Sequence, residues 1–140
     1  MRIRTAQEGD TVVLLRLVAS AIGERRAAAL VRAPGACAEL LIADELREPI
    51  GCLAYRTDWF QCTFVSAVAV AESARRCGVA RALFAALESR SPSARLFSST
   101  EETNGVAIQM HRALGFTPSG HIDNLPQGYR ELLFYKRLPR

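Results

Sequence analysis

The sequence has 140 residues and a formal net charge of +4, with 49% hydrophobic and 23% charged residues. These values are typical of one globular domain over residues 1–140 and exclude a disordered chain. The longest apolar run, residues 64–71, is too short to span a membrane, and we expect no secretion signal at the N-terminus. We therefore expect a cytoplasmic protein with no membrane partner.

The cysteine and histidine content gives no support for a metal site. None of the four cysteines lies in a C-x-x-C pair, and the histidines are His111 and His121. We expect reduced thiols and no metal ion. The basic net charge fits a solubilising surface, a nucleic acid or a polyanionic cofactor. The positions of the arginines must decide among these three.

Apolar periodicity and turn residues divide the chain into strands and helices. A short strand begins at Ile3, and Asp10 is expected to cap a helix that Gly23 ends. The remaining elements are expected as a helix over 24–32, a hairpin over 38–43 and 50–55, a strand over 63–70, a helix over 78–90, a strand over 96–98, a helix over 104–114, and strands over 116–117 and 132–135. This order predicts an α/β (α+β) domain in which helices cover both faces of a mixed sheet.

An arginine-bearing loop between the third long apolar strand and the next helix is the most informative segment. Gly78 and Ala80 leave the backbone accessible at the start of that helix, where unpaired amides and the helix dipole attract anions. Three arginines add positive charge around the same point: Arg75, Arg76 and Arg81. The loop therefore fits a pyrophosphate. The alternative is plain helix packing, because the helix carries an apolar face that needs no ligand.

Two motifs at a suitable separation carry a family resemblance. The pattern R-x-x-G-x-A from Arg75 to Ala80 resembles the Q/R-x-x-G-x-G/A signature of the GNAT N-acetyltransferases. The pattern N-x-x-A-x-x-x-H-x-x-x-G-F from Asn104 to Phe116 is similar to that family's N-x-x-A-x-x-x-Y/H-x-x-x-G-F helix. The resemblance covers nearly the whole chain. It implies a mostly antiparallel GNAT-like sheet with strand splay at the cofactor cleft.

The resemblance also implies acetyl-CoA as the co-substrate. In the family, the backbone of the splayed strand pairs with the pantetheine arm, and the loop after it holds the pyrophosphate. Carried over to this sequence, the expected cofactor-binding residues are Val68, Val70, Arg75, Arg76, Cys77, Gly78, Val79, Ala80, Arg81 and Asn104.

The implied chemistry is direct attack of an amine on a thioester in a ternary complex. A lysine-like amine has a pKa of about 10.4, so it must lose a proton before it attacks. Many relatives protonate the leaving thiolate with a tyrosine, and His111 occupies that position as the expected catalytic acid. A purely structural histidine is the alternative. Relatives often carry a glutamate where this chain has residues 66–68, so the general base stays open among Glu101, Glu102, Asp123 and a water chain.

These features predict an N-acetyltransferase that acts on a primary amine of a small molecule or an amino-acid-like acceptor. Trp59 and Tyr129 are expected to bind the acceptor, with a surface or dimer contact as the alternative for Trp59. The competing functions are a non-catalytic acyl-CoA-binding module and a protein or peptide N-acetyltransferase. No nucleic-acid partner is expected, because no aromatic stripe alternates with basic residues. The resemblance makes a homodimer a candidate assembly.

Overall fold

The computed structural model describes residues 1–25, 27–28 and 39–140. The described strands are β1 (Arg2–Thr5), β2 (Glu39–Glu45), β3 (Glu48–Trp59), β4 (Cys62–Val70), β5 (Arg95–Glu101), β6 (Thr117–Ile122) and β7 (Glu131–Arg137). The helices with described bounds are α1 (Thr11–Ile22), α3 (Val79–Arg90) and α4 (Gly105–Ala113). Much of the helix expected over 24–32, and the first residue of the expected hairpin, lie outside the described residues.

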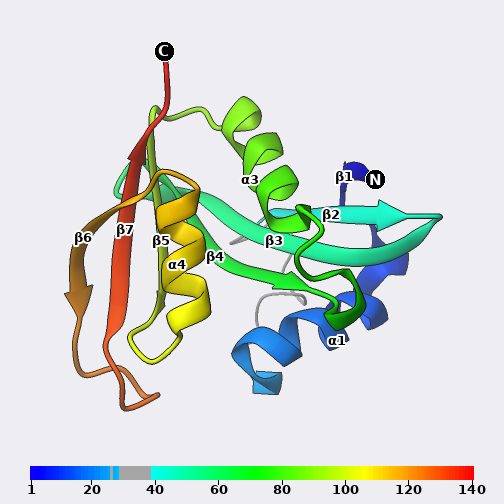
Figure 1. Ribbon diagram of the computed structural model, residues 1–140, viewed down its shortest axis with the longest axis horizontal. Coiled ribbons are helices and arrows are strands. Elements are labelled where there is room, and N and C mark those ends of the chain that lie inside the picture. The colour runs from blue at the N-terminus through cyan, green and yellow to red at the C-terminus, as the bar shows by residue number, and fades with distance from the viewer. Residues whose placement is uncertain (26, 29–38) are drawn as a thin grey trace.

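The strands form one sheet in the order β1-β2-β3-β4-β5-β7-β6 (Figure 1). The neighbours β4 and β5 run parallel, whereas every other neighbouring pair in this order is antiparallel. The mixed sheet predicted from the element order is therefore confirmed, as is the mostly antiparallel pairing that the family resemblance implied.

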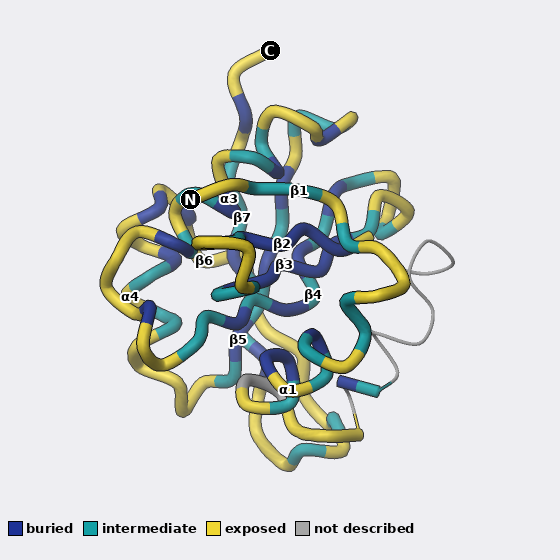
Figure 2. Tube along the Cα trace, turned by 90° about the vertical axis from the view of Figure 1, so that its right-hand side faces the viewer, coloured by how far each residue is buried: buried dark blue, intermediate teal, exposed yellow. Residues whose placement is uncertain are grey.

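Helices pack on both faces of the sheet, as predicted. The alternation along β2 shows the two cores: Leu41 and Ala43 pack with α3 and the end of α4, whereas Leu40 and Ile42 pack with α1. Successive side chains of a strand point to opposite faces, so one apolar strand serves both cores. Figure 2 shows the buried segments gathered along the central strands, with exposed segments around them.

The final strands are longer than their apolar residues indicate. β6 covers Thr117–Ile122, although the sequence predicts a strand only over 116–117. All six of its residues are exposed, so this edge strand lacks the apolar alternation from which a strand is predicted. Gly115, with φ of 91°, follows α4 as the predicted C-terminal glycine.

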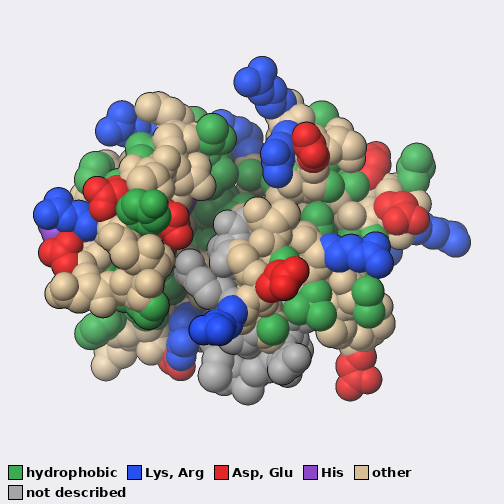
Figure 3. Space-filling model, turned by 90° about the horizontal axis from the view of Figure 1, so that it is seen from below, with side chains coloured by type: hydrophobic (Ala, Val, Ile, Leu, Met, Phe, Trp, Pro, Cys, Tyr) green, Lys and Arg blue, Asp and Glu red, His purple; other side chains and the backbone are tan. Residues whose placement is uncertain are grey.

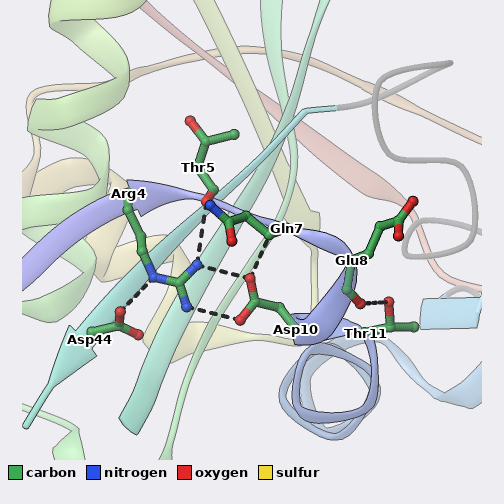
Figure 4. A network of polar contacts seen from close by, with 7 residues as sticks. All are labelled: Arg4, Thr5, Gln7, Glu8, Asp10, Thr11 and Asp44. Carbon is green, nitrogen blue, oxygen red and sulfur yellow. Dashed lines mark hydrogen bonds and ion pairs between the residues drawn. The ribbon is translucent and has the colours of Figure 1, made fainter. Parts of the chain in front are cut away.

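The start of α1 differs from the prediction in its chemistry. Asp10 stands at the N-cap position but makes no side-chain cap. Its carboxylate instead accepts two hydrogen bonds of 2.8 Å from the Arg4 guanidinium, and Arg4 also donates to Asp44 at 2.6 Å (Figure 4). The hydrogen bonds from Arg4 to Asp10 hold the pKa of Asp10 below its ordinary value. Arg4 of β1 therefore joins the start of α1 to β2, and the Asp10 carboxylate pairs with Arg4 instead of capping the helix.

Candidate active site

A single extra residue in β4 opens the sheet. Ala54 of β3 lies opposite Ala67, but its neighbour Tyr55 lies opposite Val65, so Ser66 has no partner and forms a β-bulge. The bulge also reverses the facing of the strand: Val65 packs in the core with α3, and Ala67 in the core with α1.

The pairing of β4 with β5 ends beside this bulge. The last matched residues are Val65 and Ser98, yet β4 continues to Val70 and β5 to Glu101. In Figure 1, β4 turns away from β5 beyond this point. The strand splay that the resemblance implied is therefore confirmed.

The backbone of Val68 and Val70 points into the gap between the strands. On the β3 side of β4, the Ala71 N–H donates to the Ile50 carbonyl at 2.8 Å. Backbone groups of successive strand residues alternate between the two edges, so Val70 and Val68 turn the other way. The Val70 carbonyl does accept a bond from the Arg75 Nε at 3.4 Å on that side. The open edge of β4 thus presents donors and acceptors that a partner strand would otherwise use.

The loop after β4 leads into α3, and the N-terminus of this helix lies at the end of the gap. Gly78 has φ of 77° and precedes Val79, the first residue of α3. The first intrahelical bond into this turn joins the Ala82 N–H to the Gly78 carbonyl, so the amides of Val79, Ala80 and Arg81 lack helical acceptors. The left-handed backbone at Gly78 suits glycine.

A cavity of about 710 Å³ joins these features. It is lined by the β4 segment after the bulge, the end of β5, the starts of α3 and α4, and the predicted residues Val68, Val70, Arg75, Arg76, Gly78, Val79, Ala80, Arg81, Asn104 and His111. In Figure 3, the surface is hollowed between the two halves of the molecule, and hydrophobic side chains form the floor of the hollow. Cys77 belongs to the same loop but does not line the cavity, and its exposed thiol lies 3.5 Å from the Arg75 carbonyl.

Asn104 has a structural role as well as its place at the cavity. Its Oδ1 accepts from the Ala107 N–H at 3.1 Å and so caps α4. The cap engages only the oxygen of the side-chain amide. The Nδ2 amino group remains the end that a ligand in the cavity can use.

His111 is held as a neutral imidazole. The side chain is 2% exposed and stacks on Phe134, with ring centroids 4.5 Å apart. The Ala107 carbonyl, 2.8 Å from Nδ1, can only accept, so Nδ1 carries the proton. Nε2 then accepts from the Ser98 hydroxyl at 2.7 Å. Burial lowers the pKa of His111, so at neutral pH the ring has no second proton to donate.

The residues expected to bind the acceptor lie outside the cavity lining. Trp59 ends β3 and packs against Phe64 at 4.7 Å and Phe97 at 5.2 Å between ring centroids. It pairs with Cys62 at the start of β4, the opposite end from Val70. Tyr129 is 52% exposed in the loop before β7. Neither side chain lines the cavity.

Sequence reasoning missed several polar groups that do line the cavity, among them Ser98, Ser99 and Glu131. Ser99 donates to Glu131 at 2.7 Å, although 32 positions separate them. No local motif marks these residues. The available signal is that both serines lie in the strand preceding the Asn104 motif, and that Glu131 directly precedes the last apolar strand.

A model of the acetyltransferase (GNAT) family matches residues 17–116. The chain therefore belongs to the GNAT acetyltransferase family. No curated protein matches the sequence.

Solved structures share the fold over nearly the whole chain. A GNAT-family acetyltransferase from Bacillus cereus is 29% identical with a TM-score of 0.85, covering 99% of this chain and 98% of its own. The ribosomal-protein-S18-alanine N-acetyltransferase from Escherichia coli is 17% identical, with a TM-score of 0.79 and coverage of 99% and 94%. A Salmonella typhimurium protein, solved with its cofactor acetyl-CoA, is 18% identical, with a TM-score of 0.77 and coverage of 99% and 94%.

Proposed function

We propose that the chain is an acetyl-CoA-dependent N-acetyltransferase that acetylates a primary amine of a small molecule or an amino-acid-like acceptor. The observation that carries the proposal is one cavity that joins the open edge of β4 to an arginine-flanked helix N-terminus. Such an arrangement suits a ligand that is extended and amide-containing at one end and multiply anionic at the other.

The residues present fit the two parts of acetyl-CoA. The amides and carbonyls of Val68 and Val70 are available to pair with the pantetheine amides, as a neighbouring strand would. The amides at the start of α3, together with Arg75 and Arg76, are available for the pyrophosphate. Acetyl-CoA supplies the thioester whose acetyl group is transferred.

The chain's own residues then position the reaction. Outward-facing N–H groups of β4 are the donors available for the thioester oxygen as it gains negative charge. Donation of a proton from His111 to the leaving sulfur would require the imidazolium form, which burial disfavours. We infer that His111 acts by holding the Ser98 hydroxyl in place at the cavity.

Location, assembly and partners remain predictions. No helix in the described part of the chain is long and apolar enough to cross a membrane. We retain the expected cytoplasmic location, the absence of a nucleic-acid partner and the candidate homodimer, whose stoichiometry sedimentation velocity would measure.

Thermal unfolding with and without acetyl-CoA tests the cofactor assignment. At about a hundred times its dissociation constant, a ligand that binds only the folded state adds about 2.7 kcal/mol to the free energy of unfolding. Gly78→Glu should abolish this gain, because it places a carboxylate where we expect phosphate.

Gly120→Glu is the matched control. Both glycines have positive φ, 77° and 84°, and neither has an atom within 4 Å of an added Cβ, so the two substitutions strain the backbone alike. Gly120 does not line the cavity. Equal stabilisation by acetyl-CoA in both variants would refute the site. Thiol release with small amines or with peptides then separates the small-molecule acceptor from the protein acceptor. A bound cofactor with no thiol release would favour the non-catalytic module.

A further inference from the structure

The cavity passes from one face of the sheet to the other. Lys136 of β7 pairs with Glu88 of α3, so its side chain lies on the α3 face. Alternation along β7 places Glu131 on the opposite face. Likewise Ser98 contacts His111 of α4, so the next residue, Ser99, points to the face that α1 covers. Ser20 of α1 also lines the cavity from that side.

Charge is divided between the two faces. The arginines that line the cavity lie at or just before the start of α3. Its carboxylates belong to Glu101, the last residue of β5, and Glu131, the first residue of β7. A polyanionic cofactor held by the arginines therefore occupies the α3 side. This leaves the opposite face, beside the carboxylates, as the approach for the second substrate.

Glu131 is a buried carboxylate with no basic side chain paired to it among the described residues. It is 8% exposed, and its oxygens accept from the Ser99 hydroxyl at 2.7 Å and the Gln127 amide at 3.0 Å. Among the described residues, no lysine, arginine or histidine forms an ion pair with it. Burying an anion with only neutral donors is costly, and a cation arriving in the cavity would offset that cost.

We propose that Glu131 receives the ammonium group of a cationic primary amine and removes its proton. The inference rests on the proposed acetyl transfer. One proton passes from the ammonium nitrogen to a Glu131 oxygen, and the free nitrogen lone pair forms the N–C bond. The C–S bond breaks, its electron pair stays on sulfur, and the second amine proton goes to that sulfur. Glu131 finally releases its proton to water, so the products are the amide, the free thiol and one proton.

The test compares Glu131→Gln with the wild type, using butylamine and its weakly basic analogue 2,2,2-trifluoroethylamine as acceptors. We expect kcat/KM for butylamine to fall by about 10²–10⁴-fold, the range for loss of a general base. The loss should be smaller for the weakly basic amine, which is already neutral. The rate of the variant with butylamine should rise about tenfold per pH unit as free amine forms, more steeply than that of the wild type.

Glu48→Gln is the charge-matched control. Glu48 also begins a strand, but it is exposed and does not line the cavity. Its variant should keep wild-type turnover. The acetyl-CoA dissociation constant should stay within about twofold in both variants.

If Glu131→Gln does not fold, Ser99→Ala provides the second test. Loss of the Ser99 hydroxyl should lower kcat/KM for butylamine about tenfold and leave cofactor affinity unchanged. The proposal is overturned if the folded Glu131 variant turns over at the wild-type rate, or loses the same factor with both amines at every pH. A wild type that binds acetyl-CoA but releases no thiol with either amine or with peptide acceptors overturns the acetyl transfer itself.

Discussion

Gly51 sets how closely α3 can approach the sheet. A Cβ added at this position would lie 2.7 Å from the Val79 Cγ1, 3.2 Å from the Ala69 carbonyl oxygen and 3.5 Å from the Leu83 Cδ1. A contact of 2.7 Å between carbons is not tolerated, and Val79 is 2% exposed, with little room to rotate. In a Gly51→Ala variant we therefore expect the first turn of α3 to be displaced.

The displacement should affect both stability and cofactor binding. Overpacking a buried contact costs about 1–3 kcal/mol, so the urea midpoint should fall by a corresponding amount with the m-value unchanged. Val79 begins the helix whose amides we propose hold the pyrophosphate. Loss of one hydrogen bond to a charged group, about 1.5 kcal/mol, would lower acetyl-CoA affinity about tenfold.

A second substitution isolates the contact. Val79→Ala removes the clashing methyl group. The free energy of unfolding of the double variant Gly51→Ala/Val79→Ala should therefore be higher than the value obtained by adding the losses of the two single variants. The coupling between residues in contact is about 0.5–3 kcal/mol. Urea unfolding and acetyl-CoA titration of all four proteins measure it. Additivity within about 0.5 kcal/mol would refute the assigned packing of Gly51 against α3.

Three further measurements follow from titratable groups. Burial lowers the pKa of His111, so the unfolded chain binds this proton first, and the free energy of unfolding should fall as pH drops below 6.5 towards the folded pKa. Urea unfolding from about pH 7.5 to 5.5 should show less of this slope in His111→Gln, and an equal slope would contradict the assignment. The hydrogen bonds from Arg4 lower the pKa of Asp10. The stability that they add to the folded state is therefore complete above pH 3.8, the ordinary pKa of the carboxyl, and is lost as the pH falls through the pKa of the folded protein. Arg4→Gln should therefore move the acid-denaturation midpoint to higher pH. Iodoacetamide should label exposed Cys77 quickly and more slowly with acetyl-CoA bound, whereas burial raises the pKa of Cys52 to about 12 and should leave it unlabelled until unfolding, which mass spectrometry would establish.

The sequence predicts features with local causes. The loop at Gly78 was found because arginines, small residues and a helix start lie within a few positions of one another. The order of the elements follows from apolar periodicity for the same reason. The side chain of Asp10 departs from the capping prediction because Arg4, on β1, donates to both of its oxygens.

Features with tertiary causes could not be predicted in the same way. Residues 63–70 read as one continuous apolar strand, and the bulge at Ser66 appears only when β4 is paired with β3. The Ser99–Glu131 contact joins two strands that are distant in the sequence. The family resemblance predicts Trp59 at the acceptor, but the direction of β3 takes this residue to the other end of β4 from the cavity.

In the reaction that we propose, the division of charge across the sheet gives each substrate its own route. Arginines at the start of α3 attract a polyanion and repel a cationic amine, whereas Glu131 on the opposite face has the reverse effect. Exchanging the two routes would bring like charges together on both faces, which costs affinity on each. The bulge at Ser66 makes this arrangement workable, because it opens the sheet between the faces while the strands on either side keep their own pairing. In this proposal, substrates of opposite charge meet in the gap between β4 and β5, where the backbone donors of Val68 and Val70 are available.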